Sequence, residues 1–89
     1  MKIHLSGPFL RQYKQLEPGL RLRADKILNL LLALNLRHPS LEARIVDQRR
    51  RIWKAKVTAS HRLTYQLEND VLILRRIGGH DFMERPTNW

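Results

Sequence analysis

The stretch RIWKAKVTASHRLTYQLENDVLILRRIGGHDFMERP, residues 51–86, decides the fold because polar and apolar side chains alternate along much of it. Alternation with a period of two is typical of strands, whose successive side chains point to opposite faces of a sheet. Asn69-Asp70 is a turn between two such runs. The stretch therefore predicts at least three antiparallel strands, at residues 51–58, 61–68 and 71–77.

One face of this predicted sheet is apolar and the other is basic. Alternate residues of the first strand face the core, namely Trp53, Ala55 and Val57. The opposite face carries three cations, Lys54, Lys56 and Arg62. Residues 44–62 hold +6 of the net charge of +9. Neighbouring like charges on a sheet repel one another, so the pattern favours an anionic ligand, with a merely solvated face as the alternative.

The first part of the chain predicts one strand and two helices. Residues 1–5 alternate as a short strand. Apolar residues at helical spacing predict a helix over 9–16, which Pro18-Gly19 ends, and a second helix over 20–36. The order predicts a single α+β domain, residues 1–89, with the strand and both helices packed on one face of an antiparallel sheet.

The composition favours a polyanionic partner and excludes several kinds of site. Seventeen Lys and Arg, twelve of them Arg, oppose eight Asp and Glu, and the guanidinium fork suits phosphate groups. An acidic protein is the alternative partner. The lack of cysteine excludes disulfides, thiolate metal sites and cysteine nucleophiles, and no metal or cofactor is expected. Without a signal-peptide core or a membrane-length apolar run, the sequence predicts a soluble cytoplasmic protein that does not contact membranes.

His80 follows Gly78-Gly79 at the end of the last predicted strand, which places it at the rim of the basic face. Histidine is suited to moving a proton near neutral pH. Cations that hold a phosphate, together with a histidine that protonates the leaving group, suggest metal-independent cleavage of RNA by its own 2′-hydroxyl. Lys54 or Lys56 is the candidate base. A structural role for the histidine is the alternative.

The same stretch, with RHPSLEARI at residues 37–45 ahead of it, resembles the RelE/ParE superfamily of bacterial type II toxins, above all its RelE, HigB and YafQ branches. The resemblance covers essentially the whole chain. It lies in a proline-containing loop after two helices, a strand with alternate cations, an RLTY strand and a last strand ending in RIGGH. It implies the small RelE-like fold and, in the ribosome-dependent branch, an endoribonuclease that cleaves translated mRNA.

The resemblance also implies roles for individual residues. The implied catalytic residues are Lys54, Lys56, Arg62, Arg76 and His80. Family members often carry an aromatic residue four or six positions after the histidine, where this chain has Glu84 and Pro86. Phe82 or Trp89 is therefore expected to stack on a base instead. The other predicted substrate-binding residues are arginines, namely Arg49, Arg50, Arg51 and Arg75, with a solvated turn as the alternative for the first three.

The register of the last hairpin leaves open which of Arg75 and Arg76 faces the substrate. A two-residue turn at Asn69-Asp70 pairs Thr64 with Arg75 and points Arg76 toward the core. A three-residue loop or a bulge near Gly78 reverses this arrangement. Because burying an unpaired arginine is costly, Arg76 is the expected catalytic residue.

The expected partners follow from the resemblance. They are a cognate antitoxin, the ribosome and mRNA, with a heteromeric complex that binds its own operator DNA through the antitoxin. Two alternatives share the fold. One is a ParE-like inhibitor of DNA gyrase, and the other is a non-catalytic relative that binds RNA or an antitoxin. The cations on the predicted sheet, together with His80, favour the nuclease.

Overall fold

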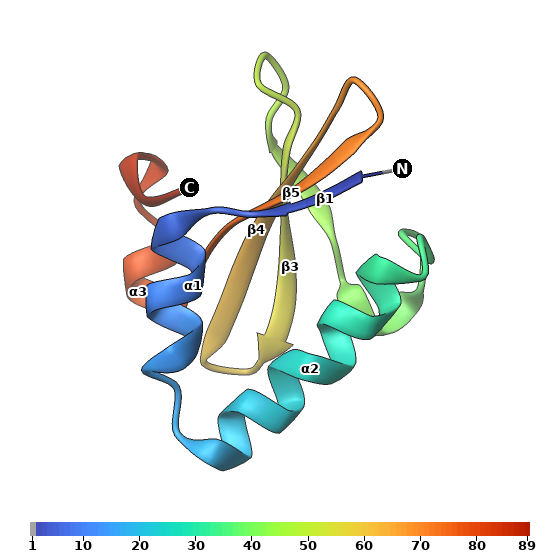
Figure 1. The fold of residues 1–89 in the computed structure, drawn as a ribbon. Coiled ribbons are helices and arrows are strands. Elements are labelled where there is room, and N and C mark those ends of the chain that lie inside the picture. Colours follow the sequence, from blue (N-terminus) through green and yellow to red (C-terminus); the bar gives the residue numbers. More distant parts are fainter. Residues whose placement is uncertain (1) are drawn as a thin grey trace.

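A computed structural model describes residues 2–89 and contains a five-stranded sheet in the order β1-β5-β4-β3-β2 (Figure 1). The strands are β1 (Lys2–Leu5), β2 (Arg44–Asp47), β3 (Ile52–Thr58), β4 (His61–Glu68) and β5 (Val71–Gly79). Strands β2 to β5 pair antiparallel, whereas β1 runs parallel to β5. The α+β fold is confirmed. The sheet is mixed rather than wholly antiparallel, because β1 pairs with the last strand instead of the next one in sequence.

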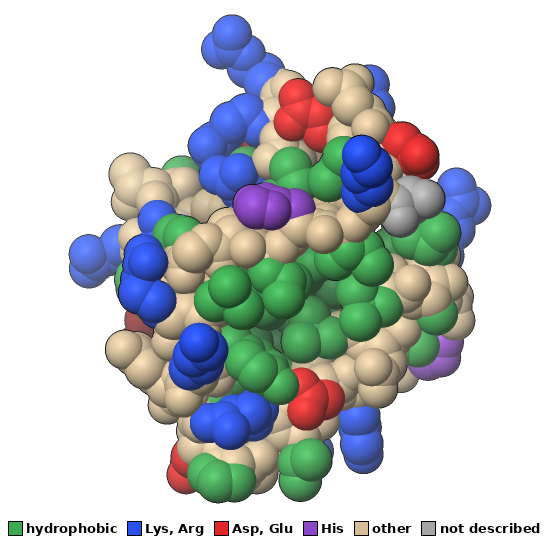
Figure 2. Space-filling model, in the orientation of Figure 1, with side chains coloured by type: hydrophobic (Ala, Val, Ile, Leu, Met, Phe, Trp, Pro, Cys, Tyr) green, Lys and Arg blue, Asp and Glu red, His purple; other side chains and the backbone are tan. Residues whose placement is uncertain are grey.

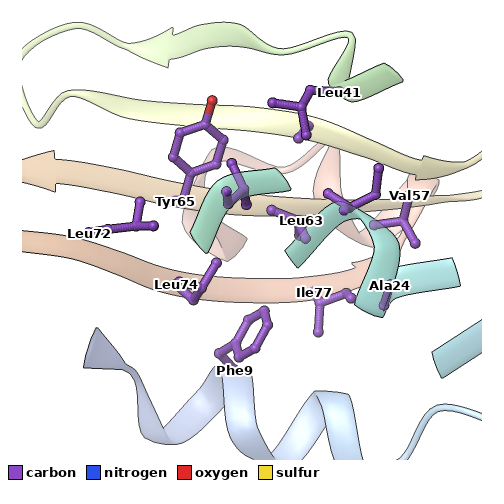
Figure 3. Packing of buried hydrophobic residues seen from close by; sticks show 12 residues of the cluster. Phe9, Ala24, Leu41, Val57, Leu63, Tyr65, Leu72, Leu74 and Ile77 are labelled. Carbon is purple, nitrogen blue, oxygen red and sulfur yellow. The ribbon is translucent and has the colours of Figure 1, made fainter. Parts of the chain in front are cut away.

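Two helices, α1 (Gly7–Lys14) and α2 (Pro18–Leu32), enclose the main core against one face of the sheet (Figures 1 and 3). The helices contribute Phe9, Ala24, Ile27 and Leu31. The sheet contributes Ala55, Val57, Leu63, Tyr65, Leu72, Leu74 and Ile77. Burying each large apolar side chain contributes about 1.5–3 kcal/mol to stability. Burial also raises the pKa of the Tyr65 phenol to about 12.

Helix α1 begins at a side-chain cap, and α2 ends earlier than its apolar pattern predicts. The Ser6 hydroxyl caps α1 by accepting a hydrogen bond from the Phe9 amide at 3.2 Å. Helix α2 ends at Leu32 because Leu34 adopts a left-handed backbone with φ of 58°. The Asn35 amide then bonds back to the Leu30 carbonyl at 2.9 Å, as in a Schellman ending. Within residues 2–89, no helix has the length and apolar character needed to span a membrane.

The β4–β5 hairpin contains a bulge that decides where its two arginines point. Its turn is Asn69-Asp70, and both residues are left-handed, as a type I′ turn requires. The register then shifts between Tyr65 and Thr64, so that Thr64 pairs with Arg76. Arg75 is the extra residue of the bulge. The predicted turn is present, and the bulge places Arg76 on the face away from α1 and α2.

The second face of the sheet carries the predicted cations and is also partly covered by the end of the chain. A short helix, α3 (His80–Met83), and a 3-10 turn, η2 (Pro86–Asn88), fold back against it (Figure 1). Met83 and Ile52 are fully buried, and neither belongs to the main core. The covering could not be predicted from the alternation, which marks a face as polar but gives no sign that a later segment will lie over it.

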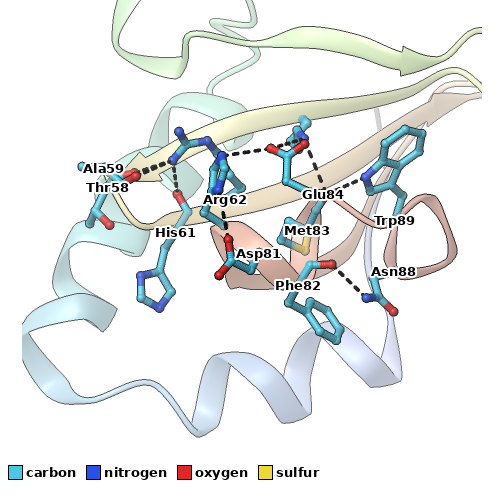
Figure 4. Close-up of polar contacts among 12 residues, drawn as sticks. Thr58, Ala59, His61, Arg62, Asp81, Phe82, Met83, Glu84, Asn88 and Trp89 are labelled. Carbon is cyan, nitrogen blue, oxygen red and sulfur yellow. Dashed lines mark hydrogen bonds and ion pairs between the residues drawn. The ribbon is translucent and has the colours of Figure 1, made fainter.

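Trp89 fixes this covering segment to the sheet. Its main-chain oxygen accepts hydrogen bonds from Arg75 Nε at 2.8 Å and from Thr64 Oγ1 at 3.4 Å. Its indole nitrogen donates to the Met83 carbonyl at 2.7 Å (Figure 4). Trp89 therefore helps to hold the covering segment against the sheet.

Candidate active site

A cavity of about 340 Å³ lies where the sheet meets α3, and ionisable side chains line it. The lining residues are Glu42, Arg44, Lys54, Lys56, Arg62, His80 and Glu84. They meet because β2, β3 and β4 are neighbours in the sheet and α3 packs against β4 and β5. Four Lys and Arg face two Glu, so this cationic pocket keeps a positive charge and suits an anion.

Lys54 is the most buried cation of the cationic pocket, with 5% of its surface exposed. Its Nζ lies 3.6 Å from Glu84 Oε1 and 3.5 Å from the Met83 carbonyl oxygen. The Trp89 ring centroid lies 5.8 Å from the same nitrogen. Fixed neighbours therefore hold the ammonium group in one place, which favours a role in stabilising charge at a defined position.

His80 lies at the mouth of the cationic pocket, and about half of its side chain is exposed. It is the first residue of α3, and its amide donates to the Ser60 carbonyl at 2.7 Å. Its Nε2 lies 2.9 Å from Glu84 Oε1, whereas its Nδ1 lies 3.6 Å from Asp81 Oδ1. One ring nitrogen thus lies against a carboxylate, and the other has no hydrogen-bond partner within 3.5 Å among residues 2–89.

Lys56 and Glu42 form an ion pair on the outer side of the pocket, with Nζ and Oε2 3.1 Å apart. Both side chains are exposed, so the pair contributes only about 0–1 kcal/mol and an incoming phosphate can displace it. Glu42 has a left-handed backbone, with φ of 42°, at the end of the 3-10 turn η1 (Pro39–Leu41). Arg44 lies directly across from Lys54 in the β2–β3 pair and adds a further cation.

The Arg62 side chain is held by hydrogen bonds to the backbone around the β3–β4 turn. Its Nη1 donates to the main-chain oxygens of Thr58 at 2.6 Å and His61 at 3.0 Å (Figure 4). The other guanidinium nitrogens make no hydrogen bond to the described residues 2–89. They are therefore available to bind a phosphate oxygen.

Arg75 and Arg76 do not line the cationic pocket, although both were predicted to act on substrate. Arg75 donates from Nη1 to Gln66 Oε1 at 3.0 Å and also bonds Trp89. Burial lowers its pKa, and the nearby Arg50 charge adds to the effect. Arg75 thus anchors the covering segment. Arg76 lies half-buried on the same face, opposite Thr64.

The arginines of the β2–β3 turn lie at the other end of the sheet from His80. Arg49, Arg50 and Arg51 line a separate cavity of about 480 Å³. Arg50 Nε lies 2.7 Å from Asp47 Oδ2, and the hydrogen bonds from the Arg50 backbone and side chain lower the pKa of that carboxyl group. Any nucleic acid that touches both this turn and the cationic pocket must therefore extend along the sheet.

Phe82 lies on the surface near His80, with 39% of the residue exposed. Its ring rests on Gly78, where an added Cβ would come within 3.0 Å of the ring. It lines a cavity of about 530 Å³ together with Arg62 and His80. Figure 4 shows the ring on the opposite side of α3 from Glu84.

The structure brings together Lys54, Lys56, Arg62 and His80, and it adds three residues that the sequence reasoning did not assign, namely Glu42, Arg44 and Glu84. Arg44 carries a signal in sequence, because it belongs to the local charge excess. Glu84 also carries one, since it stands four residues after His80, a spacing that brings side chains together on a helix. Among residues 2–89, no three His, Asp or Glu side chains are grouped as metal ligands.

The fold is similar to that of several solved toxins. YafQ from E. coli strain BL21(DE3) has a TM-score of 0.79 and 20% identity, covering 92% of this chain and 96% of that one. RelE in the RelB-RelE antitoxin-toxin complex of Methanococcus jannaschii has a TM-score of 0.74 and 14% identity, and the match covers 91% of this chain and 94% of that one. The YoeB/ParE toxin of Agrobacterium tumefaciens has a TM-score of 0.73 and 13% identity, and the match covers 90% of this chain and 99% of that one.

Comparison of sequences gives no such likeness. No family model matches the chain, and no curated protein sequence matches it. The expected RelE-like fold is thus confirmed by comparison of structures.

Proposed function

We propose that this chain, which has the fold of the RelE-like toxins, is the toxin of a type II toxin-antitoxin pair. Its activity is metal-independent cleavage of mRNA during translation, in the cytoplasm and on the ribosome. The observation that carries the proposal is the cationic pocket, where a half-exposed histidine lies at the mouth of a site containing two lysines and two arginines. This arrangement suits a phosphodiester whose nucleophile is already present in the substrate.

In the proposed reaction, the ribose 2′-oxygen attacks phosphorus and the bond from phosphorus to the 5′-oxygen breaks. The products are a 2′,3′-cyclic phosphate and a free 5′-hydroxyl. His80 donates a proton to the departing 5′-oxygen, and Lys56, the more exposed of the two candidate bases, accepts the proton of the 2′-hydroxyl. Lys54 and Arg62 stabilise the charge that develops on the phosphoryl oxygens.

The remaining cations are proposed to hold the RNA chain rather than to act on the scissile bond. Arg44 lines the cationic pocket and contacts a flanking phosphate. Arg49, Arg50 and Arg51 contact backbone phosphates of mRNA or of ribosomal RNA at the far end of the sheet. Arg76 contributes positive potential on the same face.

Phe82→Ala is expected to weaken binding of a single-stranded RNA oligonucleotide roughly 5- to 150-fold, because a base that stacks on an aromatic ring gains about 1–3 kcal/mol. Leu22→Ala is the matched control, since Leu22 is an exposed apolar residue on α2. Fluorescence anisotropy with a labelled oligonucleotide measures both affinities. Equal affinity of wild type and Phe82→Ala would remove Phe82 from the substrate site.

The proposed antitoxin binds through apolar and acidic side chains. Figure 2 presents hydrophobic side chains gathered near the centre of the helix-bearing face, with Lys and Arg around them. Exposed apolar residues include Ile3 and Leu5 of the edge strand β1 and Leu32 at the end of α2. A segment rich in Leu and Glu complements this surface and can extend to the cationic pocket. Operator DNA is then bound through the antitoxin.

Induced expression in a bacterial host, with growth measurement and mapping of mRNA 5′ ends, tests the proposed function. Growth arrest with new cuts inside translated codons is the expected result, and a translation-blocked culture should lack the cuts. Arrest without cuts would replace the proposal with inhibition of DNA gyrase. Unaffected growth would replace it with a non-catalytic binding role.

A further inference from the structure

We propose that Glu84 is a positioning residue for the proposed nuclease reaction, holding His80 and Lys54 through a single carboxylate. The inference rests on the proposed function. Oε1 of Glu84 lies 2.9 Å from His80 Nε2 and 3.6 Å from Lys54 Nζ. One oxygen atom therefore lies close to both the proposed proton donor and the most buried cation of the cationic pocket.

The backbone of α3 fixes Glu84 relative to His80. The Glu84 amide donates to the His80 carbonyl at 3.0 Å, which closes one helical turn. The preceding residue, Met83, is fully buried, and its carbonyl accepts from the Trp89 indole at 2.7 Å. The peptide group that leads into Glu84 is thus held at both its N–H and its C=O, which is what a residue that orients a reacting group needs.

The carboxylate determines which nitrogen of His80 can reach the substrate. The contact of 2.9 Å between Glu84 Oε1 and Nε2 holds one side of the ring and leaves Nδ1 of the imidazolium as the atom that delivers a proton to the 5′-oxygen. Asp81 does not compete, because its carboxylate is fully exposed and 3.6 Å from Nδ1. Glu84 therefore selects the productive arrangement without touching the substrate.

The same carboxylate keeps two cations close together. Lys54 and a protonated His80 repel one another, and an anion between them offsets that repulsion. The negative charge of Glu84 does not close the site to phosphate, because three further cations line the cationic pocket, namely Arg44, Lys56 and Arg62.

The test compares Glu84→Ala, Glu84→Gln and Asp81→Ala in ribosome-dependent cleavage. Glu84→Ala is expected to lower kcat about 10- to 100-fold with KM unchanged, as for residues that orient a reacting group. Glu84→Gln keeps a hydrogen-bond acceptor and is expected to retain an intermediate rate. Asp81→Ala removes an equal charge from α3 and is expected to stay within about twofold of wild type, since its carboxylate makes no hydrogen bond to the ring.

A second readout is independent of catalysis. When the ring is neutral, the ¹⁵N spectrum of His80 is expected to show the Nε2-protonated tautomer in wild type and Asp81→Ala, and a mixture of tautomers in Glu84→Ala. The form that donates from Nδ1 carries a proton on both nitrogens. An unchanged spectrum in Glu84→Ala, or an equal fall in kcat for Asp81→Ala, would overturn the assignment. If wild type does not cleave mRNA, the proposed function fails, and the spectrum alone then decides whether Glu84 orients His80.

Discussion

His80→Ala is expected to lower the rate of mRNA cleavage by about 10²- to 10⁴-fold, the contribution of a positioned general acid. The reason is geometric. His80 is the one histidine that lines the cationic pocket, where its ring is held by Glu84 beside four Lys and Arg residues. Ribosome binding should be nearly unchanged, because the substitution removes no permanent charge. Single-turnover cleavage on programmed ribosomes and a separate binding assay measure the two quantities.

His61→Ala is the matched control for this prediction. His61 also stands near the β3–β4 turn, and its Nδ1 lies 3.0 Å from Ser60 Oγ, but it does not line the cationic pocket. Figure 4 shows its ring directed away from Glu84. A normal rate for His80→Ala, or an equal loss for His61→Ala, would remove the proton-donor assignment.

Lys54→Met is expected to lower the cleavage rate by about 10²- to 10³-fold, the cost of removing one preorganised donor from a developing negative charge. Methionine keeps the length and the apolar contacts of the side chain, so the buried position beside the Trp89 ring stays filled. The fall should appear in kcat, because the ammonium group is fixed before substrate arrives. Single-turnover kinetics under saturating conditions measure it.

Two further variants separate this effect from a general loss of charge. Lys26→Met removes an equal charge from the exposed side of α2 and is expected to leave the rate unchanged. Combining Lys54→Met with Lys56→Met should also weaken RNA binding, with a salt slope that falls by about 0.7 for each lost phosphate contact. A wild-type rate in Lys54→Met would show that Lys54 only supports the fold, and thermal unfolding of the variant measures that role.

The shape of the cationic pocket explains why these effects differ in kind. Lys54 and His80 share the Glu84 carboxylate and are held before any ligand arrives. Lys56 is paired with Glu42 on the exposed side and must leave that partner before it can act on the RNA. Lys54 and His80 therefore need no rearrangement before the chemical step, whereas Lys56 does.

Local patterns in the sequence predict most of the fold. Alternation along residues 51–77 places β3, β4 and β5, since the period of side chains in a strand follows from backbone geometry alone. The end of α2 was not predictable in this way, because the apolar pattern continues to Leu36 while the backbone turns left-handed at Leu34. The end of a helix depends on whether the helical backbone continues or a local ending motif forms. The spacing of apolar residues does not report which of the two is more stable.

The sequence by itself determined that Lys54, Lys56 and Arg62 share one face, because parity along paired strands needs no tertiary information. Only the tertiary structure decided the role of the residues after β5. The bulge at Arg75 sets the direction of both arginines, and the folding back of α3 and η2 buries Lys54 and brings Glu84 to His80. Such contacts depend on packing between distant segments, whereas the pattern of side chains along a strand depends only on its neighbours in sequence.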